Sequence, residues 1–127
     1  MEDEIVLFFD SYALIEIYEK NLKFEKYAHA NVVTTYFQVY ETYYSLIRNG
    51  YSKDEINDFF EFLQSLCIEL KFEWIPKASE FKQIYKKRDL SYADCLGYII
   101  AKDMGIKFLT GDKEFENLPN VEFVKKN

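Results

Sequence analysis

Four acidic residues have types and positions that would suit metal-assisted phosphate chemistry: Asp10, Glu41, Asp94 and Asp112. Hard divalent cations such as Mg²⁺ and Mn²⁺ bind oxygen ligands, usually a few carboxylates together with water and substrate phosphate. Such a cation polarises a phosphoryl oxygen and lowers the pKa of an attacking water. It would also offset the repulsion between a phosphodiester and a chain whose net charge is −6. If the fold brings these acids together, they predict a metal-dependent site.

Three of these acids also have a purely structural interpretation. Asp10 and Asp112 can each cap a helical segment that follows them, because aspartate is a favoured residue at helix starts. Asp94 stands three residues after Ser91, in a spacing that suits a capping box. Each aspartate taken alone is therefore ambiguous between a helix cap and a metal ligand.

Glu41 is harder to explain as a structural residue. It is expected on a helix, four residues after Phe37 and three before Tyr44, so it shares a side with two aromatic candidates for the core. A carboxylate beside an apolar face is disfavoured unless a charged or polar group pairs with it. An ion pair with Arg48, seven residues further on, and a bound cation are both open for Glu41.

Residue counts exclude several other mechanisms. His29 is the one histidine among 127 residues, so cleavage of RNA by a pair of imidazoles is excluded. Cys67 and Cys95 form no CxxC pair, which predicts two reduced thiols and argues against a disulfide framework and a zinc site. The four glycines form neither GxGxxG nor GxxxxGK[ST], so a nucleotide cradle of those types is absent.

Periodicity predicts strands that alternate with helices. Strands are expected at 5–9, 31–35, 70–75, 106–109 and 121–124, and helices at 11–19, 37–48, 52–66, 78–87 and 91–104, with a helical turn at 113–117. This order predicts a single α/β domain over residues 1–127, a three-layer α/β/α arrangement around a central, mostly parallel sheet. Sites in such sheets lie beyond the carboxyl ends of the strands, which directs attention to Asp10 and Asp112.

Helical spacing also predicts which side chains face the core. In the helix at 37–48, Phe37, Tyr40, Tyr44 and Ile47 fall on one stripe, and in the helix at 78–87 Ile84 is expected to point inward. The tyrosines of the helix at 37–48 nevertheless wrap around it too broadly for one face. We therefore expect some of them to line a partner surface or to stack on bases.

Two features predict the compartment. The longest apolar run, residues 5–9, is far shorter than the ~20 residues that a membrane span needs. The acidic start at residues 1–4 has the wrong charge for a secretory signal. We expect a cytoplasmic protein that does not bind a membrane.

Four segments around the acids resemble the PIN-domain nucleases. Residues 6–15 resemble the opening strand and first acid of that family, and residues 35–42 are similar to its helix that carries the glutamate. Residues 90–101 resemble the segment with the third acid preceded by a hydroxyl residue, and residues 108–115 resemble the last strand and fourth acid. The four segments follow one another in the family's order and span nearly the whole chain. Within the family, the chain resembles the VapC-like toxins of toxin–antitoxin pairs.

The resemblance implies a PIN-like fold and a Mg²⁺- or Mn²⁺-dependent endoribonuclease that hydrolyses RNA phosphodiester bonds with metal-activated water. It further implies a homodimer and a cognate antitoxin protein as partners. The residues that match the family's catalytic and metal-binding acids are Asp10, Glu41, Asp94 and Asp112, and those that match its supporting hydroxyls are Ser11, Ser91 and Thr110.

The sequence departs from the family pattern just before and after the last acid. Gly111 stands where the family often has arginine or asparagine, and Glu114 and Glu116 follow where some members have a further aspartate. Both differences leave the number of bound metal ions open. The rival interpretation is a non-catalytic PIN-like domain that binds a protein or RNA, which the presence of all four acids disfavours.

One cluster of basic residues offers candidate contacts to an RNA backbone. It consists of Lys82, Lys86, Lys87 and Arg88, and a solvated helix face is the competing interpretation.

Overall fold

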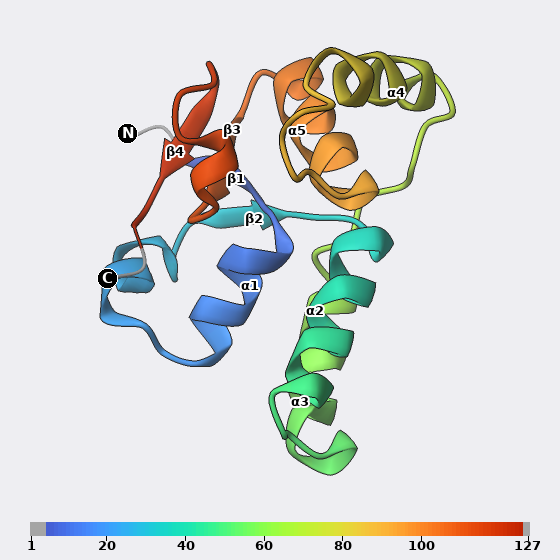
Figure 1. The fold of residues 1–127 in the computed structure, drawn as a ribbon. Helices are drawn as coiled ribbons and strands as arrows, with labels where there is room; N and C mark the ends of the chain where they lie inside the picture. The colour runs from blue at the N-terminus through green and yellow to red at the C-terminus, as the bar shows by residue number, and fades with distance from the viewer. Residues whose placement is uncertain (1–4, 126–127) are drawn as a thin grey trace.

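The computed structural model describes residues 5–125, so the acidic start of the chain and its last two residues lie outside the described part. Four parallel strands form one sheet in the order β2-β1-β3-β4 (Figure 1). The elements in chain order are β1 (Val6–Phe9), α1 (Ser11–Tyr18), η1 (Leu22–Tyr27), β2 (Asn31–Val33), α2 (Tyr36–Arg48), α3 (Lys53–Gln64), α4 (Trp74–Ile84), α5 (Tyr92–Met104), β3 (Lys107–Thr110), η2 (Lys113–Phe115) and β4 (Val121–Phe123). The α/β class and the edge position of the last strand are confirmed.

Helices cover both faces of this sheet, which makes three layers. In Figure 1, α5 and α4 lie on one side of the strands and α1 lies on the other, while α2 and α3 run side by side beyond α1. Successive residues of a strand point to opposite faces, so Phe8 belongs to the core under α4 and α5 whereas Leu7 and Phe9 belong to the core under α1. The apolar run of β1 is therefore buried on both faces, as its sequence predicts.

Gly97 lets α5 lie close against the sheet. A Cβ atom at this position would come within 2.8 Å of the Phe8 ring and 3.0 Å of the Phe108 ring. The side chain of Gln38 would be equally close, at 2.9 Å from its Nε2 atom. The absence of a side chain at Gly97 thus brings the start of α5, where Asp94 lies, near β1 and α2.

The strand expected at 70–75 is wrong. Residues 72–73 form a turn and Trp74 already begins α4. Pro76 lies in the first turn of α4, where a backbone N–H has no partner within the helix, so proline is tolerated there. The sequence predicts that Pro76 ends a strand, whereas Pro76 accompanies the start of a helix.

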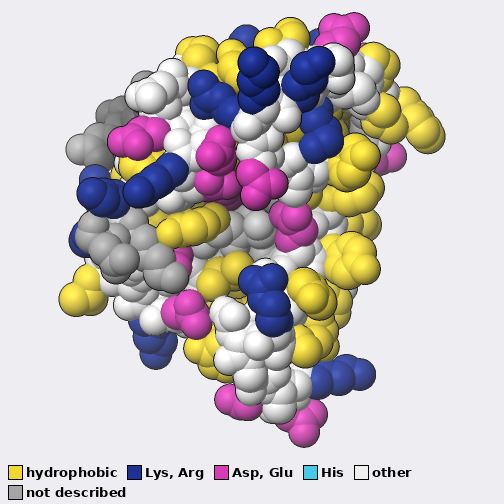
Figure 2. Space-filling view, in the orientation of Figure 1, with side chains coloured by type: hydrophobic (Ala, Val, Ile, Leu, Met, Phe, Trp, Pro, Cys, Tyr) yellow, Lys and Arg dark blue, Asp and Glu magenta, His cyan; other side chains and the backbone are white. Residues whose placement is uncertain are grey.

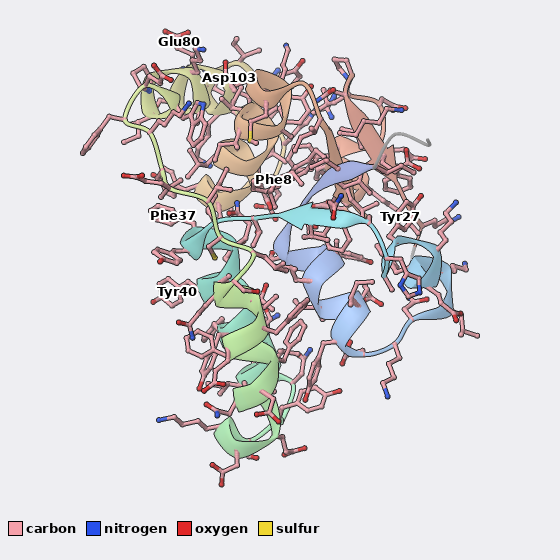
Figure 3. The ribbon with its side chains drawn as sticks, turned by 180° about the vertical axis from the view of Figure 1, so that it is seen from behind. Phe8, Tyr27, Phe37, Tyr40, Glu80 and Asp103 are labelled. Carbon is pink, nitrogen blue, oxygen red and sulfur yellow. The ribbon has the colours of Figure 1, made fainter. Side chains whose placement is uncertain are left out.

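The expected core face of α2 is also wrong. Phe37, Tyr40 and Tyr44 are 48%, 75% and 57% exposed, and Ile84 of α4 is exposed in the same way. Hydrophobic side chains gather along one side of the molecule over α2 and α4 in Figure 2, and Phe37 and Tyr40 point away from the fold in Figure 3. The buried residues of α2 are instead Gln38, Val39, Thr42 and Leu46.

Buried hydrogen bonds explain why a partly polar face of α2 turns inward. Gln38 donates from Nε2 to the carbonyl of Ala93 at 2.7 Å, and Thr42 donates from its hydroxyl to the carbonyl of Gln38 at 2.8 Å. Polar side chains that are satisfied in this way can be buried without a large loss of free energy.

Among residues 5–125, no helix is long and apolar enough to cross a membrane.

Candidate active site

Asp10 and Asp112 follow the two central strands of the sheet. Phe9 of β1 pairs with Leu109 of β3, so the carboxyl ends of these strands lie side by side. The backbone N–H of Asp10 donates to the carbonyl of Leu109 at 3.3 Å. Because β2 lies on one side of β1 and β3 on the other, this is a switch point in strand order, where α/β folds bind ligands.

Thr110 joins the two aspartates. Its buried hydroxyl accepts a hydrogen bond from the backbone N–H of Asp112 at 3.0 Å and also interacts with the Asp10 carboxylate. Each aspartate in addition caps a helix: Asp10 accepts from the N–H of Ala13 at 2.8 Å and Asp112 from the N–H of Glu114 at 3.0 Å. Both aspartates therefore cap helical segments, as the structural interpretation predicts.

Glu41 and Asp94 come from two helices. The hydroxyl of Ser11, at the start of α1, donates to Oε1 of Glu41 at 3.1 Å. Ser91 and Asp94 form the expected capping box at the start of α5, in which each side chain accepts from the other residue's backbone N–H at 3.0 Å. The three predicted hydroxyl residues thus each make a hydrogen bond with one of the four acids.

All four acids line one open hollow of about 410 Å³. The residues that line it are Asp10, Ser11, Tyr12, Ile15, Glu41, Tyr44, Ser45, Arg48, Ser91, Asp94 and Asp112. Glu114 and Glu116 are not among them. A carboxylate has about four acceptor positions, so the capping bonds, even with the bond from Thr110 to Asp10, leave Asp10, Asp94 and Asp112 able to bind a further group.

Arg48 does not pair with Glu41. Within residues 5–125 there are two ion pairs, Lys77–Asp103 and Lys107–Glu122, and neither involves a residue of the hollow. The Arg48 guanidinium instead lies over the Tyr44 ring, 5.6 Å from its centroid. The structural alternative for Glu41 is therefore wrong in this structure.

Burial and mutual repulsion make two of the acids hard to ionise. Burial raises the pKa of Asp10 well above its usual value, and the charges of Asp94 and Asp112 add to that rise, against hydrogen bonds from Thr110 and Ala13. Burial likewise raises the pKa of Asp94 to about 6, with repulsion from Glu41 and Asp112. A bound cation would offset this repulsion and stabilise the ionised carboxylates.

The donor chemistry of the hollow fits a hard divalent cation. Its four carboxylates and the hydroxyls of Ser11 and Ser91 supply oxygen atoms alone, the ligand type that Mg²⁺ and Mn²⁺ prefer. Over residues 5–125, no three His, Cys, Asp or Glu side chains stand close enough to form a ready group of ligands. The acids therefore share a hollow, and their side chains would have to turn towards a common point to bind one ion together.

A buried polar segment at the start of α2 positions the site, and the sequence analysis missed it. Thr34 donates from its hydroxyl to the carbonyl of Phe9 at 2.9 Å, next to Asp10. Thr35 bonds to Gln38, which in turn donates to the carbonyl of Ala93, next to Asp94. Three polar residues within five positions, around the start of the helix that carries Glu41, are the signal that could have revealed it.

Gly111 has a steric reason to be glycine in this chain. A Cβ atom there would collide with the Tyr12 ring and would lie 2.8 Å from the carbonyl oxygen of Val124. The ring of Tyr12 therefore occupies the space that an arginine or asparagine would need at position 111. Tyr12 also lines the hollow, so this departure from the family pattern changes one wall of the site.

The predicted basic residues lie beside the acids, on the other side of the α5 start. Lys82, Lys86 and Arg88 line a second hollow of about 370 Å³, together with Tyr92 and other residues of α4 and α5. Lys87 is exposed and is not part of its lining. Figure 2 shows Lys and Arg side chains grouped next to acidic ones on this face of the molecule.

A comparison with protein families matches the PIN domain over residues 7–121. The chain belongs to the PIN domain family. The fold is similar to VapC20 of Mycobacterium tuberculosis, a sarcin–ricin loop cleaving toxin (TM-score 0.75, 16% identity, 93% of this chain and 98% of that one). It is also similar to a chain of a toxin–antitoxin complex from Klebsiella pneumoniae (TM-score 0.73, 16% identity, 91% and 95% covered). A Pyrobaculum aerophilum protein matches with a TM-score of 0.64 and 18% identity, over 97% and 93% of the two chains. None of the curated proteins matches the sequence significantly.

Proposed function

We propose that this PIN-domain protein is a Mg²⁺- or Mn²⁺-dependent endoribonuclease and the toxin of a toxin–antitoxin pair. The observation that carries the proposal is that Asp10, Glu41, Asp94 and Asp112 line one hollow at the carboxyl ends of the central strands. These four acids come from parts of the sequence up to 102 positions apart, and an α/β sheet has its binding site at this edge. The likeness in fold to VapC20 of Mycobacterium tuberculosis supports the choice of a nuclease.

In this proposal the four acids would bind the metal ion, and neighbouring hydroxyl side chains fix the positions of the acids. A bound Mg²⁺ or Mn²⁺ supplies charge against the phosphodiester and a water of lowered pKa. The hydroxyl of Ser11 donates a hydrogen bond to Oε1 of Glu41 and keeps that carboxylate turned towards α1. Thr110 joins Asp10 to the loop that carries Asp112. Lys82, Lys86, Lys87 and Arg88 are proposed to contact the RNA backbone.

The test is cleavage of a panel of labelled RNAs on a denaturing gel, with EDTA and with Mn²⁺. We expect cuts with Mn²⁺ and none with EDTA for the wild type, and loss of the cuts in Asp112→Asn. Glu116→Gln is the matched control, because Glu116 is an exposed acid four residues further on that does not line the hollow. If no RNA of a broad panel is cut with Mn²⁺, the non-catalytic binding domain becomes the better interpretation.

We further propose that two copies form a homodimer through the apolar side of α2 and α4. Phe72 and Tyr92 are 88% and 81% exposed, and together with Phe37 and Ile75 they line an apolar hollow of about 500 Å³. Exposed apolar area of this extent is typical of a protein interface. Light scattering should give about twice the 15.2 kDa of the chain, and Phe72→Asp should lower that mass whereas Phe62→Asp on α3 should not. A mass near that of one chain at micromolar concentration would contradict the homodimer.

We also propose an antitoxin protein that covers the acid hollow, and inhibition of RNA cleavage tests this partner. The product of a neighbouring reading frame, purified and added in equal amount, should abolish RNA cleavage. It should also raise the Tm of this protein above that of the protein alone. An antitoxin that binds without blocking cleavage would contradict a partner that covers the acid hollow.

A further inference from the structure

Two of the four residues in the basic cluster donate hydrogen bonds to backbone carbonyls. The ammonium of Lys82, on α4, donates to the carbonyl of Leu90 at 2.5 Å. The guanidinium of Arg88 donates from Nη1 to the carbonyl of Glu114. Both side chains are part-buried, and neither belongs to the two ion pairs found within residues 5–125. These two cations are therefore fixed by carbonyl oxygens and do not pair with a carboxylate.

The other two residues of the cluster, Lys86 and Lys87, are exposed. Over the described residues 5–125, their side chains make no hydrogen bond and no ion pair. Lysine commonly keeps its charged end in water in this way. The basic cluster thus contains two exposed cations and two that are bound to the fold.

Lys82 holds the start of α5. Its acceptor is the carbonyl of Leu90, a buried residue directly before Ser91, the N-cap of that helix. The backbone N–H of Ser91 in turn donates to Oδ2 of Asp94 at 3.0 Å. The Tyr92 ring lies 4.8 Å from the ammonium and stabilises this position of Lys82. Lys82 thereby connects α4 to the turn that places Asp94 in the acid hollow.

Arg88 connects the loop before α5 to the segment of Asp112. Its acceptor is the carbonyl of Glu114 in η2, and the backbone N–H of Glu114 donates to Oδ1 of Asp112 at 3.0 Å. Asp94 and Asp112 carry like charges, which repel each other across the hollow. A hydrogen bond from a charged donor is stronger than one between neutral groups, so the bond from Arg88 opposes a separation of the two segments.

We propose that Lys82 and Arg88 are positioning residues of the acid hollow, an inference that rests on the proposed metal-dependent function. They fix the two turns that carry Asp94 and Asp112, and they do so without contact to the metal ion or to RNA. A ligand set that is held in place before binding loses less free energy when it binds an ion. The exposed lysines of the cluster keep the proposed contact to RNA.

A cation that positions the acids and a cation that acts by its charge alone have opposite effects on metal binding. A positive charge near the acids repels Mn²⁺, so its removal should strengthen the binding of Mn²⁺. Removal of a positioning residue should weaken this binding, because the carboxylates are then less well ordered. The direction of the change in Mn²⁺ affinity therefore separates the two roles.

The test measures Mn²⁺ binding to the protein without RNA, from the loss of the electron paramagnetic resonance signal of free Mn²⁺. Lys82→Met and Arg88→Met remove the hydrogen-bond donors and keep an apolar stem. Lys86→Met is the matched control, because it removes the same charge from an exposed side chain four residues after Lys82. Lys82→Arg is the conservative variant that keeps a charged donor. Circular dichroism verifies that each variant is folded at the temperature of the measurement.

We expect the Kd for Mn²⁺ to rise about tenfold in Lys82→Met and in Arg88→Met, a typical effect when a group that orients a metal ligand is lost. Lys82→Arg should bind Mn²⁺ nearly as tightly as the wild type. Lys86→Met should bind it as tightly as the wild type or slightly more tightly. RNA cleavage by Lys82→Met should recover when the Mn²⁺ concentration is raised about tenfold to match the higher Kd, whereas a defect caused only by a lost contact to RNA would persist.

Two results would overturn the positioning role while the ribonuclease function stands. One is that folded Lys82→Met and Arg88→Met bind Mn²⁺ as tightly as the wild type or more tightly, and the other is that Lys86→Met weakens binding equally. If Arg88→Met does not fold, the comparison of Lys82→Met with Lys82→Arg decides alone. A wild type that binds Mn²⁺ but cuts no RNA contradicts the proposed function, and the Kd values still decide the positioning role. A wild type that binds no Mn²⁺ contradicts both.

Discussion

Asp94→Asn should stabilise the metal-free protein and at the same time reduce its response to Mg²⁺. The folded state holds the Asp94 carboxyl at a pKa of about 6, against an ordinary value of 3.8, because burial and the charges of Glu41 and Asp112 oppose its ionisation. Asparagine carries no charge and can still accept the capping bond from the backbone N–H of Ser91. The substitution therefore removes a buried charge, together with its repulsion from Glu41 and Asp112, and keeps the helix start.

The magnitude follows from the two pKa values. At about 1.36 kcal/mol for each tenfold change in proton affinity, their difference corresponds to about 3 kcal/mol. Asp94 is part-exposed, so water screens its charge and we expect about 1–2 kcal/mol. For a domain of this size that is a rise of roughly 3–8 °C in Tm at pH 7.5 in EDTA.

The pH dependence has a defined sign. Between about pH 4 and 6 the folded chain keeps the Asp94 proton that the unfolded chain has already lost, so wild-type stability falls as the pH rises through this window. The difference between Asp94→Asn and wild type should be full at pH 7.5 and mostly gone at pH 4. Urea unfolding in EDTA at both pH values measures it, with Glu116→Gln as the control for an exposed acid.

Mg²⁺ should narrow the difference in stability between the wild type and the variant. With ~10 mM Mg²⁺ and an assumed Kd of ~1 mM, binding to the folded state alone contributes about 1.4 kcal/mol, or roughly 3–6 °C in Tm. This shift should appear in the wild type and shrink in Asp94→Asn. A variant that is no more stable than wild type in EDTA would refute a destabilising charge at Asp94, and an unchanged Mg²⁺ shift would remove Asp94 from the metal site.

Three further substitutions test the scaffold of the site by thermal and urea unfolding. Gly111→Ala should lower stability by about 1–3 kcal/mol, because its Cβ would collide with the Tyr12 ring; an unchanged Tm would mean that this ring moves freely. Gln38→Leu should cost about 1–3 kcal/mol, since it removes one donor to the buried carbonyl of Ala93 and leaves the buried hydroxyl of Thr35 without its acceptor, and a neutral result would show that water replaces Gln38 there. Ser52→Ala removes the cap of α3 and should cost about 1 kcal/mol without any change in RNA cleavage, because no residue of α3 lines the acid hollow; a loss of cleavage would mean that α3 supports the site.

Local patterns in the sequence were enough to predict most of the fold. A continuous apolar run predicts a strand buried on both faces, and β1 is one because strands of a parallel sheet have helices on either side. Ser52 and Glu55 predict the start of α3, since a capping box involves residues only three apart. The alternation of such elements then restricts the sheet to a parallel arrangement, and that arrangement places Asp10 and Asp112 at one edge.

The sequence could not decide which face of α2 is buried. Apolar spacing favoured Phe37, Tyr40 and Tyr44, yet the buried face carries Gln38 and Thr42. Whether a polar side chain can be buried depends on a partner far away in the sequence, here the carbonyl of Ala93, 55 positions from Gln38. Apolar periodicity within one helix gives no information about such a partner.

Only the tertiary structure distinguished a helix cap from a residue of the acid hollow. Asp10, Asp94 and Asp112 are caps by local geometry, and the sequence predicted that role from spacing within four residues. Their common position beside Glu41 depends on the pairing of β1 with β3 and on the close approach of α5 at Gly97. A helix cap is a short-range interaction that the sequence encodes locally, whereas the electrostatic field of four acids exists only where long-range packing brings them together.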